Sequence, residues 1–232
     1  ALSLVGSEMC IRDRSYSVNF VNIGGISNIT QTVKWDELDK KKDYIKACDI
    51  APGNCLIDEW VRKKSKKKYD IGGTLASIGK TDELILNQAL ENFNIGPPYK
   101  DSLDIKDFDI SFAKGLSLED GTSTLTDFTS SQISKALKYF KDPEKNTIFL
   151  VCGGGRKNKY LMKSILRSFD IIKDSKKINF YPVEEYGIDG DFVESQAFGY
   201  LAIRSILKLP ISFPNTTGCK KPISGGEIVK NF

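Results

Sequence analysis

The chain has 232 residues, of which 40% are hydrophobic and 28% are charged. This composition is typical of a folded globular protein, and it excludes a fibre and a disordered chain. The net charge of +4 is too small to indicate nucleic-acid binding by itself. No apolar run reaches the roughly 18 residues that a membrane span needs. Histidine is absent, so no imidazole can act as a base or metal ligand. We therefore expect neither a nucleic acid nor a membrane as a partner.

The first 14 residues, ALSLVGSEMCIRDR, resemble the translated read-through of a sequencing adapter. We therefore expect residues 1–14 to be non-native and the protein proper to begin near residue 15. The five cysteines are odd in number and match no common metal-binding spacing. This usage is typical of buried free thiols in the reducing cytoplasm.

Five segments have the alternation or the continuous apolar run that is typical of β-strands. The first two flank Gly24-Gly25 and predict a hairpin. The fourth, TIFLVC, is apolar throughout, as in a buried strand. The predicted strands are residues 16–23, 29–35, 44–49, 147–152 and 177–181.

Six segments predict helices, and the first follows the Pro-Gly-Asn turn at 52–54. Its apolar stripe consists of Leu56, Ile57, Trp60 and Val61. Residues 62–68, RKKSKKK, lack the interleaved aromatics of a nucleic-acid patch, so we interpret them as the solvated end of this helix. The other predicted helices are residues 81–93, 101–112, 124–140, 158–169 and 192–207. Residues 210–232 are predicted to be mostly loop, and the whole pattern indicates an α/β fold with a mixed sheet.

Three glycine turns are expected at strand ends: Gly24-Gly25, Gly72-Gly73 and Gly153–Gly155. Glycine lets backbone N–H groups approach a phosphate closely, although each run alone is also compatible with an ordinary turn. None of them fits the Walker or the dinucleotide-binding pattern. Three such turns in one α/β chain favour a phosphate-binding site.

Carboxylates occur at two further positions of interest. Asp49 ends a predicted strand, where it could act as a general base, contact Mg²⁺ or satisfy backbone donors at a helix entry. Acidic residues also cluster at 184–191, where they could bind a sugar or a metal. Their spacing by itself favours Asp191 as the N-cap of the last long helix, with Glu194 at the third helical position.

Five stretches, taken together and in this order, resemble the anhydro-N-acetylmuramic acid kinase family. They are FVNIGGISNIT at 20–30, DIAPGNCLIDEW at 49–60, VCGGGRKNKYLMK at 151–163, EEYGIDGDFVESQAFGYLAIR at 184–204 and PNTTGCKKPISGG at 214–226. The resemblance implies the actin/hexokinase/70-kDa heat-shock ATPase superfamily, in which two ribonuclease-H-like lobes enclose an ATP cleft. Residues 15–232 would be the C-terminal lobe, with a mixed sheet flanked by helices and with the N-terminal lobe missing.

The resemblance also implies an activity. The family uses ATP and Mg²⁺ to open the anhydro bridge of 1,6-anhydro-N-acetylmuramic acid with water and to phosphorylate O6. The product, N-acetylmuramic acid 6-phosphate, belongs to cell-wall recycling in the bacterial cytoplasm. The full-length protein is expected to be a homodimer. The family's first phosphate loop, GTSxDGxD, has no counterpart here, so we expect this chain alone to be inactive.

Site residues follow from the resemblance position by position. Asp49 matches the catalytic base, which would deprotonate the water that attacks the anomeric carbon. Glu194 and Lys100 match sugar-binding positions, whereas the metal ligands stay undefined. The positions that match phosphate- and ATP-binding residues are Asn22, Gly24, Gly25, Ser27, Asn28, Gly53, Asn54, Gly153, Gly154, Gly155 and Asn158.

The sequence departs from the family pattern at a few positions. Ala51 replaces the usual glycine before Pro-Gly-Asn, which is tolerable unless that position needs a positive φ. Residues 97–104 are an altered form of the family's sugar-binding motif, and Ile105 stands where an arginine is common. Two alternatives stay open: another sugar kinase of the superfamily, and a non-catalytic nucleotide-binding single-lobe module. A lone lobe would expose apolar surface, so we expect poor solubility or dimerisation of residues 15–232.

Overall fold

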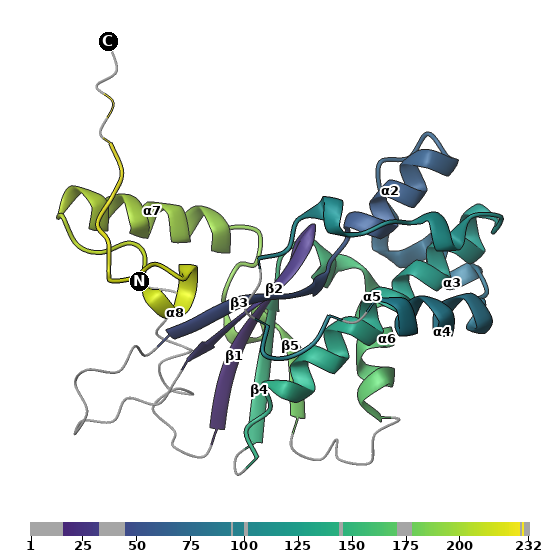
Figure 1. Cartoon of the computed structure of the whole chain (residues 1–232), viewed down its shortest axis with the longest axis horizontal. Helices are drawn as coiled ribbons and strands as arrows, with labels where there is room; N and C mark the ends of the chain where they lie inside the picture. The colour runs from purple at the N-terminus through teal and green to yellow at the C-terminus, as the bar shows by residue number, and fades with distance from the viewer. Residues whose placement is uncertain are drawn as a thin grey trace.

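The computed structural model describes residues 16–32, 45–93, 95–99, 102–143, 146–170, 178–227 and 229. A five-stranded sheet in the order β3-β2-β1-β4-β5 forms its centre (Figure 1). Strand β2 is antiparallel to both of its neighbours, whereas β1, β4 and β5 are parallel to one another. The strands are β1 (Tyr16–Ile23), β2 (Ile26–Thr32), β3 (Ile45–Pro52), β4 (Asn146–Cys152) and β5 (Ile178–Pro182). The carboxyl ends of β1, β3, β4 and β5 therefore meet at one edge of the sheet.

Seven α-helices are described around this sheet: α2 (Cys55–Lys64), α3 (Thr74–Ile78), α4 (Glu83–Asn92), α5 (Leu118–Tyr139), α6 (Lys159–Asp170), α7 (Val193–Ile206) and α8 (Pro214–Thr217). Figure 1 shows α2 to α6 on one side of the sheet and α7 and α8 on the other. Short 3-10 helices cover Ile71–Gly73, Ile105–Asp107, Ser111–Ala113, Gly154–Lys157 and Val183–Tyr186.

The main core lies between the sheet and the helices α5 and α6. Val21 and Ile23 of β1 and Phe149 of β4 point into it, and Ile133 of α5 and Ile165 of α6 close it. A second core joins α2, α4 and α5 around Trp60 and Phe128. The opposite face of the sheet is covered by the segment that follows β5, through Val183 and Ile188. All four residues of the stripe predicted on α2 are buried, which confirms that prediction.

Helix α5 is the central helix of the molecule, and most of its buried positions are polar. Ser117 caps its N-terminus by accepting a hydrogen bond of 3.0 Å from the Asp120 N–H. The helix begins six residues before the predicted start at 124, because its first turns bury threonine and serine rather than an apolar stripe. The hydroxyl of Thr122, for example, donates to the Leu118 carbonyl one turn earlier, at 2.6 Å, so its burial leaves no donor unpaired.

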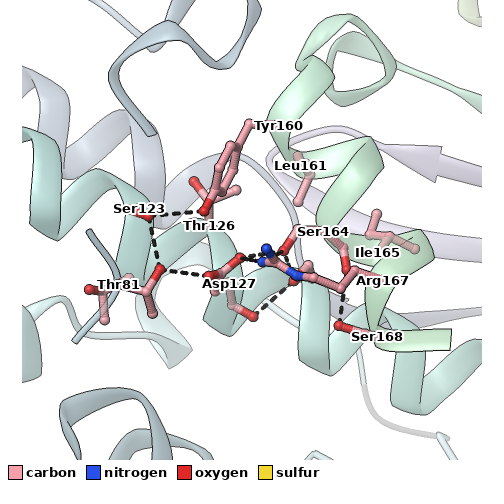
Figure 2. A network of polar contacts seen from close by, with 12 residues as sticks. Thr81, Ser123, Thr126, Asp127, Tyr160, Leu161, Ser164, Ile165, Arg167 and Ser168 are labelled. Atoms are coloured by element: carbon pink, nitrogen blue, oxygen red, sulfur yellow. Dashed lines mark hydrogen bonds and ion pairs between the residues drawn. The ribbon is translucent and has the colours of Figure 1, made fainter. Parts of the chain in front are cut away.

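Polar contacts between α5 and α6 converge on Asp127 (Figure 2). Its carboxylate accepts hydrogen bonds from Thr81 at 2.6 Å, from Arg167 at 2.8 Å and from Ser164. Thr81 also contacts Ser123, which contacts the Tyr160 hydroxyl at 3.1 Å. A charge that is mostly enclosed must be paired in this way to be tolerated. The network therefore fixes α6 against α5.

The other predicted elements agree with the structure apart from their ends and one clear error. The predicted helix at 101–112 is wrong, because the described part of this stretch forms two separate 3-10 turns. The side chains of Asp104 and Asp109 accept from the nearby N–H groups of Lys106 and Ser111, which favours turns over a continuous helix. Strand β2 begins three residues before its predicted start, and residues 33–35 lie outside the described part.

The prediction that Asp191 caps α7 is also wrong. The N-cap is Phe192, which makes no side-chain cap, and the Asp191 carboxylate is bound by two basic side chains instead. No residue of α7 is buried. None of the described helices is both long and apolar enough to cross a membrane.

Candidate functional site

The hairpin turn between β1 and β2 is joined to the Pro-Gly-Asn turn that follows β3. The Gly25 carbonyl accepts from the Gly53 N–H at 2.9 Å, and the Gly24 carbonyl accepts from the Asn54 N–H at 2.7 Å. The Asn54 side-chain amide also donates to the Gly24 carbonyl at 3.2 Å. The N–H groups of Gly53 and Asn54 are thus used inside the protein, so these two residues support the turn. The N-terminus of α2 begins next to it and adds a favourable potential for an anion.

Asp49 lies on β3 just before this turn and is half-buried. It pairs in register with Asn28, and one extra residue, Ile50, separates that pair from the next one, between Ser27 and Ala51. Such a bulge redirects side chains at the end of a strand. The Asp49 Oδ2 accepts from the Leu103 N–H at 3.0 Å and from the Ser102 hydroxyl at 3.2 Å. A loop far away in the sequence therefore orients this carboxylate.

The glycine run at the end of β4 packs against the end of β1. A Cβ on Gly153 would overlap Asn22 Oδ1 and lie 2.7 Å from the Ile23 carbonyl oxygen, and a Cβ on Gly155 would overlap the Ile23 side chain. Gly153 also has φ +80°, which favours glycine. The run at 153–155 therefore packs against the last residues of β1, directly before the run at 24–25.

The glycines of these turns fall into two groups. Gly53, Gly153 and Gly155 are packed so closely against other residues that a side chain cannot be accommodated. Gly25 and Gly154 are exposed, and a Cβ on either would meet no atom closer than 3.7 Å. The open pair is the part of the surface on which a phosphate could lie against the backbone, which fits the group that the resemblance implies.

Asn158 and the Gly72-Gly73 turn have structural roles nearby. The buried Asn158 side chain accepts from the Leu161 N–H at 3.0 Å and so caps the start of α6. Gly73 packs against Asn158 and Tyr160 and is not part of the edge formed by the other two glycine runs. The third run is therefore a turn that supports α6.

The structure describes only some of the residues that are predicted to bind the sugar. Lys100 lies outside the described residues. Glu194 is exposed in the first turn of α7, and its charge, with that of Glu184, acts on Cys152 at the end of β4. Burial raises the pKa of Cys152 to about 11, and Arg156 opposes this shift. Ile105 is 52% exposed, and a Cβ on Gly25 would lie 3.7 Å from its Cδ1, so it borders the turn. Ala51 is in strand β3 without a positive φ, so its methyl group is accommodated.

Sequence reasoning missed Arg156, which follows the glycine run directly. Its guanidinium bonds Glu184 at 2.6 Å and Asp191 at 2.7 Å. The signal in the sequence was an arginine beside a glycine run. Its two acidic partners belong to the cluster at 184–191, which was interpreted as a sugar or metal site or a helix cap. Among the described residues, no group of three or more acidic or cysteine side chains could hold a metal ion, and Cys48, Cys55, Cys152 and Cys219 are free.

Comparison with known proteins identifies the family. The family model for anhydro-N-acetylmuramic acid kinase matches residues 4–231. The chain belongs to this kinase family. The five-stranded mixed sheet flanked by helices agrees with the fold class expected for it, a ribonuclease-H-like lobe of an actin-like ATPase.

Two relatives show how much of such a protein is present. The chain is 51% identical over 215 residues to the anhydro-N-acetylmuramic acid kinase of Pelagibacter ubique (strain HTCC1062), a match that covers 91% of this chain and 55% of that protein. It is 38% identical over 218 residues to the same kinase of Zymomonas mobilis subsp. mobilis, with coverages of 93% and 55%. The chain thus spans about half the length of the curated relatives it matches. A xylulose kinase from Lactobacillus acidophilus has 11% identity and a TM-score of 0.40, over 89% of this chain and 50% of that one.

Proposed function

We propose that this chain supplies the catalytic base and one wall of the ATP site of an anhydro-N-acetylmuramic acid kinase. In the proposed reaction, water adds to the anomeric carbon of 1,6-anhydro-N-acetylmuramic acid as the bond from that carbon to O6 breaks. The released O6 takes the γ-phosphoryl group of ATP, which leaves ADP and N-acetylmuramic acid 6-phosphate. The remaining half of the active site would come from the part of the relatives that this chain does not span.

The position of Asp49 is the observation that carries this proposal. Both hydrogen bonds that described residues make to its carboxylate go to Oδ2. We propose that Oδ1 accepts the proton of the attacking water, while Leu103 and Ser102 hold the carboxylate in place. Positioning and charge stabilisation account for most of the catalysis of phosphoryl transfer, so a fixed base just before the Pro-Gly-Asn turn suits this reaction.

ATP would lie with its phosphates on the open glycines, Gly25 and Gly154, while Asn22 and Asn28 line the hairpin beside them. Ser27, also predicted here, is buried, and its hydroxyl donates to the Pro52 carbonyl at 3.2 Å, so it supports the turn. Mg²⁺, when bound, neutralises charge on the phosphates. It usually keeps several waters and needs only one or two protein carboxylates. The sugar would reach the same edge beside Ile105, which borders the hairpin turn. Glu194 and Lys100 are the other sugar-binding residues that the resemblance implies.

The test uses a chimera, because the activity belongs to a longer protein. This chain replaces the matching 215 residues of the Pelagibacter ubique kinase, and ATP consumption is measured with and without the anhydro sugar. We expect consumption only with that sugar, whereas the chain alone should show none. Asp49→Asn should lower kcat by about 10² to 10⁴, the usual contribution of a general base, while the KM of the sugar changes little.

The matched control is Asp109→Asn, because Asp109 is an exposed aspartate on a loop outside the site. It should leave kcat unchanged. Normal turnover of Asp49→Asn would refute the assignment of the base. Preference for free hexoses would favour another sugar kinase, and nucleotide binding without sugar-dependent hydrolysis would favour a non-catalytic module.

A further inference from the structure

Arg156 is the first residue after the glycine run, and its side chain is only 6% exposed. An arginine beside a phosphate-binding loop is usually interpreted as a ligand of the phosphate. The contacts of this arginine argue for a different role, because all three guanidinium nitrogens are bound to the protein itself.

The three nitrogens face three different parts of the chain. Nε donates to Glu184 Oε1 at 2.6 Å, in the segment that follows β5. One terminal nitrogen donates to Asp191 Oδ1 at 2.7 Å, two residues before α7. The other donates to the Gly153 carbonyl at 2.9 Å, and the Arg156 backbone N–H points to the same oxygen at 3.4 Å. The planar fork of arginine suits such multiple bonding, which a lysine cannot reproduce.

The surrounding backbone is fitted to this arrangement. A Cβ on Gly190 would overlap the Arg156 guanidinium and lie 2.7 Å from its carbon atom and from Glu184 Oε1. Partial burial acts to raise the pKa of Glu184, but the hydrogen bond and charge of Arg156 outweigh it and lower that pKa. Hydrogen bonds from Lys157 and Arg156 lower the pKa of Asp191. Both carboxylates are therefore ionised at neutral pH and balance the arginine.

We propose that Arg156 is a positioning residue that holds Gly153–Gly155 in its ATP-binding conformation by tying the loop to Glu184 and Asp191, and that it does not bind phosphate itself. The role of the loop rests on the proposed function. The same bonds join the loop to the segment between β5 and α7.

Kinetics of the chimera separate this role from that of a phosphate ligand by the direction in which the KM of ATP changes. If Arg156 positions the loop, Glu184→Gln and Asp191→Asn release the loop and raise the KM of ATP. If Arg156 binds phosphate, the same changes free the guanidinium and lower that KM. We expect an increase of about tenfold or more for Arg156→Ala and also for Arg156→Lys, with the KM of the sugar and kcat changed far less.

Lys157→Ala is the matched control. Lys157 also bonds Asp191, at 2.7 Å, but its side chain is 60% exposed, so its loss should leave the KM of ATP within twofold. Full rescue by Arg156→Lys, or a lower KM in the two carboxylate variants, would overturn the proposal.

A second measurement needs no activity and uses this chain as it is. Hydrogen exchange measures the protection of two backbone N–H groups, those of Arg156 and Asn158. The Asn158 N–H donates to the Gly155 carbonyl at 3.0 Å. Exchange in this peptide should be faster in Arg156→Ala, Glu184→Gln and Asp191→Asn, and unchanged in Lys157→Ala. Unchanged exchange in a folded Arg156→Ala protein would refute the positioning role. An inactive wild-type chimera would instead count against the proposed function, leaving the exchange result to decide the role of Arg156.

Discussion

At the scale of single residues, burial and neighbouring charges shift the pKa of a side chain, and Asp58 of α2 is an example. Burial raises the pKa of Asp58 to about 6; Arg62 opposes this shift and Asp70 adds to it. Because the native pKa lies above the ordinary value of 3.8, the fold favours the protonated carboxyl. The stability that this group contributes is therefore complete below pH 3.8 and is lost as the pH rises through 6.

Asp58→Asn should accordingly stabilise the chain at pH 8 and have little effect at pH 4. We expect about 1 kcal/mol, which is smaller than the full shift implies because the group is partly solvated. Urea denaturation at the two pH values measures this. Asp120→Asn is a control that should change the stability in the opposite direction, because the Lys80 N–H and Ser117 lower the pKa of Asp120. An Asp58→Asn effect independent of pH would contradict this account.

At the scale of elements, neighbouring glycines of one loop differ in whether they can accept a side chain. Gly153 has a positive φ and is packed against Asn22 and Ile23, whereas its neighbour Gly154 has open space around it. We expect Gly153→Ala to lower the free energy of unfolding by about 1–3 kcal/mol, and Gly154→Ala to change it by less than about 0.5 kcal/mol.

The same pair should behave differently in catalysis. Gly154→Ala should raise the KM of ATP in the chimera, since its methyl group would occupy the proposed phosphate position. Urea denaturation of the chain and kinetics of the chimera give the two readouts. Equal stabilities of the two alanine variants would show that the packing around Gly153 is not a constraint.

At the scale of the whole molecule, α7 has no buried residue, and several of its large apolar side chains are exposed. Phe198 is 67% exposed and Ile206 is 60% exposed. Such a patch favours association, so the chain expressed alone should self-associate in light scattering. Phe198→Gln with Ile206→Gln should reduce this association. Leu84→Gln, which removes a single 80% exposed leucine on α4, should not. A monodisperse monomer of the unmodified chain would contradict the prediction.

Local patterns were sufficient for the strands and for most helices, because alternation and apolar spacing are properties of short segments. The family was predicted from the resemblance of five stretches of the sequence. Local patterns failed for 101–112, where aspartate side chains form local turns, and for the start of α5, where buried hydroxyls carry no apolar signal.

The sequence by itself therefore determined the class of fold, the segments that build the edge of the sheet and the candidate base, Asp49. Only the tertiary structure decided which glycines are open, that Ser102 and Leu103 orient Asp49, and that Asp191 bonds Arg156 instead of capping a helix. The physical reason is that each of these roles depends on residues far away in the chain, which only the folded chain brings together.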